Sequence, residues 1–386
     1  MRVLLVAMAD SVHTARWIGQ FDGSEVEFTL FPSTPNRRTH TFIKSQLRMS
    51  QQKLIRIRRS DRFLTFPLGL IDLLVRNRIR SRRLAALLRN ESFDVVHLLE
   101  TQHAGYLYAS TARFPKPKTP VLLSLWGSDL NWFGKFEGHK RRIIEALRLV
   151  DLLLIECQRD VELAKKFGYV GAVSDPIPAS GGLGVRLESS ERGAFPQPST
   201  RRALVIKGYT GFVGKARVAA RVVSRLRREL ASYEIHFYSV SFLMLLGLHV
   251  LRLRTGLKLR IHRKKTLSHE EMLAMFRSAR VSLSLSLSDG LPGSMREAAW
   301  TGAFPIESKG SCVCEWTPAD SGVMVVDPLN EDEVATALRR ALNDDELVDR
   351  AVEINRNFVR RLVDEDVREL SLRQYRDAVT LWRAFL

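Results

Sequence analysis

Cysteine is scarce in this sequence of 386 residues, which has three: Cys157, Cys312 and Cys314. So few thiols exclude a disulfide framework, and one Cys-x-Cys pair is too little for a zinc site. A reducing, cytoplasmic setting is therefore predicted, with Cys312 and Cys314 as packing residues. Long hydrophobic runs are missing too. The most apolar window, 241–251, is ended by Arg252, well short of the ~20 residues of a membrane span. The N-terminus turns polar by Asp10 and lacks a cleavage site, so no export signal is expected.

Several binding fingerprints are also absent. No G-x-G-x-x-G follows the first strand, where the chain reads AMADSVHT from Ala7, and this argues against a nicotinamide-dependent oxidoreductase. The phosphate-loop pattern G-x-x-x-x-G-K-[ST] fails at Ala216. No zinc-finger or homeodomain pattern occurs, and the arginines lack the interleaved aromatics of RNA-binding surfaces. Nucleic acid is therefore not the expected partner, although a basic binding protein without catalysis stays open as an alternative.

Acidic residues are outnumbered, since 60 Lys and Arg against 42 Asp and Glu give a net charge of +18. Such an excess favours a polyanionic partner. Residues 37–89 hold fifteen of the basic residues and only two acids, with apolar residues between them. We hypothesise that this segment docks on an anionic membrane surface, peripherally and on the cytoplasmic side. A solvated basic face is the alternative.

Short apolar runs alternate with helical patterns along the chain. Strands are expected at 3–7, 26–31, 94–99, 120–125 and 152–156 in the first half, and at 203–206, 234–238, 259–262, 281–287, 303–306 and 322–326 in the second. Fully apolar strands separated by helices indicate a parallel sheet that is covered on both faces. The predicted fold class is therefore α/β, with two Rossmann-like parallel-sheet domains facing each other across a cleft.

The domain boundaries follow from the turns. Residues 179–200 are rich in glycine, proline and polar residues and are predicted to connect the domains. We expect an N-terminal domain over 1–190 and a second domain over 191–365. Residues 353–386 are predicted to be helical throughout. Their apolar stripe predicts that the last helix, 366–386, packs back on the first domain.

The tract SDGLPGSMREAAWT at 288–301 is the first candidate site. A strand is expected to end into Asp289-Gly-Leu-Pro-Gly, and a helix to begin near Ser294. The free N–H groups of a helix start favour phosphate. Asp289 and Glu297 can both face the crevice at the sheet edge, where carboxylates suit paired sugar hydroxyls. A plain capping box, Ser294 with Glu297, is the alternative interpretation.

The tract VIKGYTGFVGKAR at 205–217 is the second candidate site. Here Lys207 and Gly208 end a strand and Lys215 opens a helix, so two ammonium groups are available to neutralise a diphosphate. No strong metal-ligand constellation occurs, so lysines and helix ends would stabilise the departing diphosphate without a metal or other cofactor. Ordinary surface lysines are the alternative.

These tracts, with the opening VLLVAMADSVHTARW and the continuation GAFPIESKGSCVCEW, resemble the family-four retaining glycosyltransferases of the GT-B fold. The resemblance spans nearly the whole chain. It implies a nucleotide sugar, usually a uridine diphosphate sugar, held by the second domain and a glycan or lipid-linked acceptor held by the first, in cell-envelope or polysaccharide biosynthesis. It also implies that Glu297 holds the ribose, Asp289 the donor sugar, and Lys207 and Lys215 the diphosphate. The donor-binding set so implied is Lys207, Gly208, Lys215, Gly290, Leu291, Pro292 and Ser294. Another nucleotide-dependent enzyme of the same fold stays open.

Two positions depart from the family pattern. The first acidic residue is usually Glu, and Asp289 is shorter by one methylene. Where many members carry His-Gly at a strand end of the first domain, this chain has Trp126-Gly. On the acceptor side we expect His13, His103, Trp126 and Asp129, each beside a strand end of the first domain. Loop residues or helix caps are the alternative for each of them. Glu315 and Trp316 are expected to close the donor loop or to pack in the core.

Overall fold

The computed structural model describes residues 1–35, 39–48, 54–57, 71–72, 78–112, 119–183, 196–317, 322–362 and 364–384. Much of the basic segment 37–89 lies outside these residues, as does 184–195 of the predicted connection. The chain divides into two compact units, Met1–Arg186 with Val363–Leu386 and Leu187–Leu362. None of the helices in the described ranges is both long and apolar enough to cross a bilayer.

The first unit is built on a parallel seven-stranded sheet in the order β3-β2-β1-β4-β5-β6-β7. Its strands are β1 (Arg2–Ala7), β2 (Glu27–Pro32), β3 (Ile55–Arg56), β4 (Val95–Leu99), β5 (Val121–Ser124), β6 (Leu152–Leu154) and β7 (Ala172–Val173). Between them lie α1 (Val12–Gly19), α2 (Thr41–Arg48), α5 (Arg78–Asn90), η2 (Thr101–Gly105), α6 (Tyr106–Ala109), η3 (Phe133–Lys135), α7 (Glu137–Leu147) and α8 (Gln158–Lys166).

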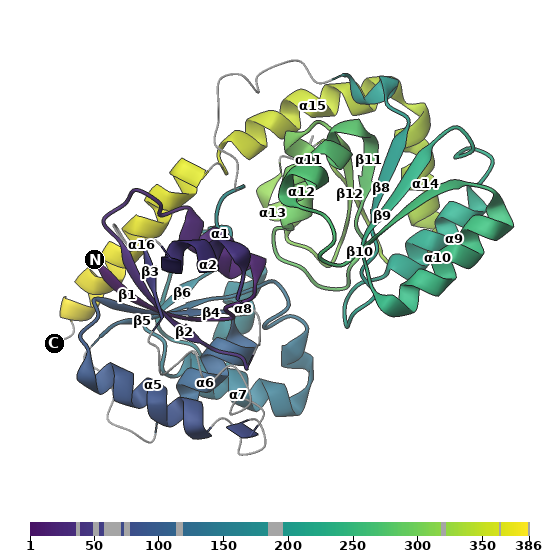
Figure 1. Ribbon diagram of the computed structural model, residues 1–386. Coiled ribbons are helices and arrows are strands. Elements are labelled where there is room, and N and C mark those ends of the chain that lie inside the picture. Colours follow the sequence, from purple (N-terminus) through teal and green to yellow (C-terminus); the bar gives the residue numbers. More distant parts are fainter. Residues whose placement is uncertain are drawn as a thin grey trace. The chain divides into compact units, whose positions relative to one another are not determined.

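Helices cover both faces of this sheet (Figure 1). On one face, Leu84 of α5 and Ile143 of α7 pack with the strands in a buried cluster. On the other, Trp17 of α1 and Ile43 of α2 join a second cluster, together with Tyr375 of α16 (Asp364–Ala384). Burial on both faces explains why strands such as β1 and β4 are apolar without alternation.

The second unit repeats the plan with a six-stranded parallel sheet in the order β10-β9-β8-β11-β12-β13. Its strands are β8 (Ala203–Lys207), β9 (Glu234–Val240), β10 (Lys258–Arg263), β11 (Ala279–Leu283), β12 (Phe304–Ser308) and β13 (Met324–Val326). Its helices are η5 (Pro198–Thr200), α9 (Ala216–Arg225), α10 (Phe242–Thr255), α11 (His269–Ser278), α12 (Gly293–Trp300), α13 (Val313–Trp316), α14 (Glu331–Asn343) and α15 (Asp345–Arg360). Leucines and valines of α9, α10 and α14 fill one face of the sheet, and α11 and α12 cover the other (Figure 1).

The last helix, α16, belongs to the first unit through a buried polar centre. Trp17 Nε1 donates to the Tyr375 hydroxyl at 3.0 Å, and His97 Nδ1 lies 2.9 Å from the same oxygen. His97 Nε2 lies 2.8 Å from Ser124 Oγ. Burial lowers the pKa of His97 to about 3, so the ring is neutral. Because an indole N–H can only donate, the phenol hydrogen is free to serve His97 Nδ1. The whole network is then satisfied by one arrangement of protons.

Two predicted elements differ most in extent from the structure. Residues 353–386 do not form one helix, because α15 ends at Arg360, a turn containing the buried Leu362 follows, and α16 begins at Asp364. The strand predicted over 281–287 ends at Leu283. Its alternating Ser and Leu residues continue the strand pattern, but beyond Ser284 the backbone bonds to the loop that precedes α9 instead.

Candidate functional site

The strand order places the first candidate groups of the second unit side by side. In a sheet of this order the chain leaves β8 and β11 in opposite directions around the sheet, and ligands bind in the crevice outside the carboxyl ends of such a pair. Lys207 ends β8, and the segment 284–292 follows β11. The two tracts singled out in the sequence therefore lie at the same edge of one sheet.

Backbone hydrogen bonds hold the two tracts together. The Leu287 N–H donates to the Val213 carbonyl at 2.9 Å, and the Lys215 N–H donates to the Leu285 carbonyl at 2.8 Å. Between them, Gly214 and Ser286 form an antiparallel bridge. This pairing is what ends β11 early. It also fixes Lys215, at the start of α9, relative to the Asp289 loop.

Lys207 and Asp289 form an ion pair at the centre of this edge. Lys207 Nζ lies 3.4 Å from Asp289 Oδ2, and the two side chains are 25% and 33% exposed. Burial disfavours the ammonium, but attraction by Asp289 outweighs it and raises the pKa of Lys207. Lys207 is therefore a fixed cation. The residue after Lys207 must be a glycine, because a Cβ on Gly208 would meet the carbonyl oxygen of Tyr238 at 2.9 Å.

A second loop, at 309–312, sets the position of Asp289. The Asp289 N–H donates to the Gly310 carbonyl, and the Cys312 N–H donates to the Gly290 carbonyl, both at 3.0 Å. A Cβ on Gly310 would lie 2.5 Å from the Leu287 carbonyl, so only glycine lets these loops approach this closely.

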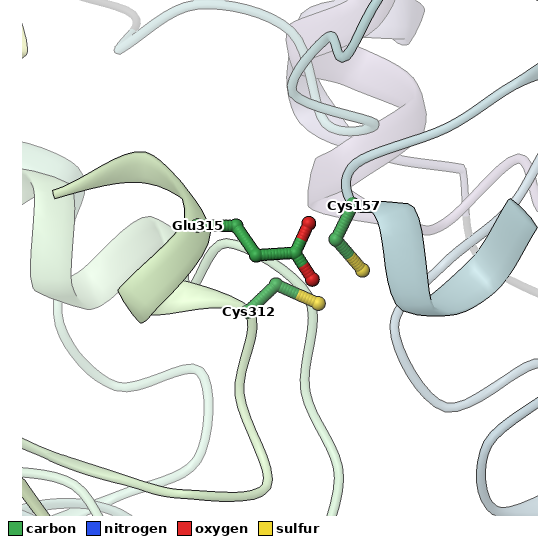
Figure 2. A group of neighbouring side chains, drawn as sticks. All are labelled: Cys157, Cys312 and Glu315. Atoms are coloured by element: carbon green, nitrogen blue, oxygen red, sulfur yellow. The ribbon is translucent and has the colours of Figure 1, made fainter. Parts of the chain in front are cut away.

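Cys312 and Glu315 lie on either side of the start of α13. Cys312 is buried and is the N-cap residue, and Glu315 is exposed (Figure 2). Cys157, drawn in the same figure, precedes α8 in the other unit. Cys314 is exposed, so the prediction that it is a packing residue is wrong. Cys312 does pack, against the loop that carries Asp289.

The capping box that was the alternative interpretation at Ser294 does not form. The N-cap of α12 is Pro292, without a side-chain hydrogen bond, and the helix begins at Gly293. The backbone N–H groups of Gly293 and Ser294 have no acceptor in the described part of the chain, and neither does the buried Ser294 hydroxyl. Free N–H groups at a helix N-terminus favour an anion.

Glu297 is buried in α12 and meets a residue that the sequence did not indicate. His269 Nε2, at the start of α11, lies 3.1 Å from Glu297 Oε1, while the Glu297 side chain is 2% exposed. The serine of the Ser268–Glu271 capping box places His269 at that helix start. Glu297 is thus held by a neighbouring helix, and the bond to the Ser294 backbone that the capping-box alternative required is absent.

Two further ionisable residues stand behind Lys207. Glu307, on β12, is 2% exposed, and its Oε1 has no hydrogen-bond partner within the described ranges. Burial raises the pKa of Glu307 to about 8, while Lys207 opposes that rise. Tyr238 pairs with Lys207 across β9 and β8, and burial raises its pKa to about 12. Only Lys207 among the three carries a charge at neutral pH.

The acceptor-side candidates lie at the corresponding edge of the first sheet. His13 follows β1, and its ring meets the Trp126 ring edge-on with centroids 4.9 Å apart. The buried Trp126 indole nitrogen finds no hydrogen-bond acceptor among the described residues. His103 follows β4 within η2 and is exposed. His13 and Trp126 are therefore brought together.

Asp129 supports the loops around it. Its Oδ2 accepts from the Thr101 N–H at 2.8 Å and from the Trp126 N–H at 3.1 Å. Glu100 accepts from the His103 and Ala104 N–H groups, and burial raises the pKa of both carboxyls. Glu100 has φ 81° and ψ 158°, a region nearly restricted to glycine. Backbone strain of this kind is typical of functional sites.

Sequence reasoning missed His269, Glu307 and Glu100. His269 and Glu297 are 28 positions apart, and no local pattern links them. Glu307 is a lone acid in the apolar strand FPIES, which is a signal that a sequence reader can use, because a buried strand seldom holds an unpaired carboxylate. The φ of Glu100 has no sequence signal.

Comparison with known proteins agrees with this architecture. Residues 2–155 match the model of the glycosyl transferase 4-like family. No curated protein matches the sequence. Anabaena HepE in complex with UDP and glucose is 11% identical, with a TM-score of 0.70 over 98% of this chain and 100% of that one. Sucrose-phosphate synthase from Thermosynechococcus elongatus is 12% identical, with a TM-score of 0.73 over 100% of both chains. The lipopolysaccharide outer core galactosyltransferase WaaB is 13% identical, with a TM-score of 0.67 over 98% of this chain and 99% of that one.

The two sheets and these likenesses define the class, which is the GT-B fold. With the family match over residues 2–155, the predicted resemblance to GT-B glycosyltransferases is confirmed.

Proposed function

We propose that the protein is a retaining, metal-independent glycosyltransferase that moves a sugar from a uridine diphosphate sugar to a glycan or lipid-linked acceptor. One observation carries the donor half of this proposal. Lys207, Asp289 and the loop that opens into Lys215 meet at the carboxyl ends of β8 and β11, where a sheet of this order binds ligands.

The charges at this edge suit a departing diphosphate. When the bond between the sugar carbon and the phosphate oxygen breaks, negative charge grows on that oxygen. Lys207 and Lys215 supply fixed positive charge, and the Gly293 and Ser294 N–H groups supply donors that need no reorganisation. These groups can stabilise the leaving group without a metal.

The carboxylates suit the two sugars of the donor. Asp289 is one-third exposed beside Lys207, so its oxygens can accept from hydroxyls of the transferred sugar. Glu297 is held by His269 and would accept from the ribose hydroxyls. HepE, which shares the fold, was solved with UDP and glucose, and this supports the choice of a uridine diphosphate sugar.

The acceptor side and the cellular setting complete the proposal. The acceptor would lie near His13, His103 and Trp126, with Asp129 holding the surrounding loops. The basic segment 37–89 would bring the enzyme to the cytoplasmic face of a membrane in cell-envelope or polysaccharide synthesis. Arg80 of that segment is not available for lipid, because it is buried against Asp72.

A donor panel tests this proposal. We expect thermal shift to select one uridine diphosphate sugar, and NMR of the product to show the anomeric configuration of the donor. Turnover should persist in a metal chelator. A product with the inverted anomeric configuration would show that the enzyme is not retaining. Loss of activity in the chelator would show that it needs a metal. If no nucleotide sugar binds while a gel-shift assay shows tight nucleic-acid binding, the alternative of a basic binding protein replaces it.

A further inference from the structure

An apolar stripe is exposed along α10, on the second unit. Its members are Phe242, Leu243, Leu246, Val250 and Leu253, with exposed fractions of 77%, 75%, 72%, 39% and 81%. At about 100° per residue, these five positions fall within an arc of roughly 100°. The opposite side of the helix, with Met244 and Leu248, is buried in the core. Because a surface helix normally turns a polar face to water, this stripe indicates an interaction surface.

The loop after β8 reaches the start of the helix. The Thr210 and Ser241 hydroxyls lie 2.5 Å apart, which brings the loop after β8 to the N-cap of α10. Phe212 of that loop is 77% exposed. Phe212 therefore belongs to the loop that reaches the N-cap of α10.

Positive charge borders the stripe at both ends. Residues 235–269 contain seven Lys and Arg and no Asp or Glu. Arg252 and Arg254 are exposed in the last turn of α10. At the other end, the Lys264 N–H donates to the Val240 carbonyl, two residues before the helix starts. These three cations form no ion pair with any residue that the structure describes.

We propose that the α10 stripe docks on the surface of an anionic lipid bilayer, with its leucines and phenylalanine among the acyl chains and the cations among the headgroups. Apolar side chains flanked by Lys and Arg are the pattern of helices that lie in the membrane interface. The helix has 14 residues, about 21 Å at 1.5 Å per residue, and therefore lies in the interface and does not span.

Charge favours a bilayer over a second copy of the chain. A two-fold contact through the stripe would place α10 against α10, either parallel or antiparallel. Since both ends are basic, either orientation sets cation against cation, and such juxtaposition is repulsive. An anionic bilayer meets both ends with opposite charge.

Flotation of the full-length protein with vesicles tests this docking. Vesicles of phosphatidylcholine alone are compared with vesicles that also contain phosphatidylglycerol, at low and high salt. The stripe variant is Leu246→Gln with Leu253→Gln, and the charge variant is Arg252→Gln with Arg254→Gln. Leu329→Gln is the matched control, because Leu329 is an exposed leucine of the same unit outside α10. Circular dichroism and UDP binding check that each variant is folded.

We expect the wild type and the control to float with phosphatidylglycerol vesicles in a salt-sensitive way. The stripe variant should partition at least about tenfold less, because two leucines lose their burial. The charge variant should lose its preference for phosphatidylglycerol. All variants keep segment 37–89. If the stripe variant and the charge variant both float as well as the wild type, the proposal is overturned and docking is assigned to that segment. A wild-type dimer that the stripe variant disperses, without any lipid binding, would overturn it in favour of self-association.

Discussion

At the scale of single residues, the ionisable groups of the second unit separate into a charged front and a neutral back. Lys207 and Asp289 are partly exposed and paired, whereas Glu307 and Tyr238 are buried behind them with raised pKa values. Because Glu307 and Tyr238 are neutral, they do not offset the positive charge of Lys207, and Asp289 is the carboxylate that does. A diphosphate arriving at Lys207 therefore meets one competing carboxylate.

Replacement of Glu297 tests the ribose contact. Glu297→Ala should lower transfer by about 10²–10⁴-fold, because two charge-assisted hydrogen bonds to the ribose are worth roughly 3–6 kcal/mol. Steady-state kinetics and UDP calorimetry measure the loss. Glu270→Ala, an exposed glutamate on the neighbouring helix α11, is the control and should behave as the wild type. Normal turnover in Glu297→Ala would show that the ribose lies elsewhere.

Glu307 predicts a pH dependence of donor affinity. Its pKa of about 8 means that the carboxyl is neutral below that pH and ionised above it, while the raised pKa of Lys207 keeps the ammonium charged throughout. A diphosphate should therefore bind about three- to tenfold more weakly as pH rises from 7 to 9.5, a range above the phosphate pKa near 6.

Calorimetry of UDP across that range gives the measurement, and Glu307→Gln should flatten the profile at the level seen at low pH. An equally steep profile in Glu307→Gln would assign the effect to another group.

The positions of residues in the fold were predictable where one tract carried them. Lys207, Lys215 and Asp289 stand at strand or helix ends that apolar patterns reveal, and the structure brings their tracts together. The partner of Glu297 was not predictable, because His269 reaches it across two helices that are neighbours only in the folded chain.

At the scale of elements, β11 and α16 show what periodicity misses. Alternating Ser and Leu extend the pattern of β11 to Leu287, yet the backbone there pairs with Val213 and Lys215. Long-range pairing overrides a local preference. The pattern at 353–386 is helical on both sides of Leu362, so composition gave no sign of the turn between α15 and α16.

We expect the stability of α16 to depend most on Tyr375. Tyr375→Phe removes the acceptor of Trp17 Nε1 and the donor to His97 Nδ1, both of them buried. Unpaired buried groups cost about 1–3 kcal/mol, so the α16 amides should exchange with deuterium roughly ten- to hundredfold faster. Thr380→Val, which removes an exposed hydroxyl from the same helix, should leave exchange unchanged. Unaltered exchange in Tyr375→Phe would mean that packing alone holds the helix.

At the scale of the whole molecule, the sequence predicted two parallel-sheet units because apolar strands buried on both faces leave few other architectures. The strand orders, 3-2-1-4-5 in each unit, then follow the doubly wound plan, in which ligands bind at the switch point of the sheet. The net charge of +18 predicted an anionic partner but not its position. Which side of α10 is exposed depends on how the helix packs, and the sequence alone does not show it.

The preference for a diphosphate over a monophosphate tests the donor site most directly. Calorimetry should show that UDP binds the wild type at least about tenfold more tightly than UMP, because Lys207, Lys215 and the α12 N-terminus meet the second phosphate. Lys215→Ala should erase most of that preference, and Lys258→Ala, an exposed lysine on β10, should preserve it. Equal binding of UDP and UMP by the wild type, or an intact preference in Lys215→Ala, would contradict a diphosphate site at this sheet edge.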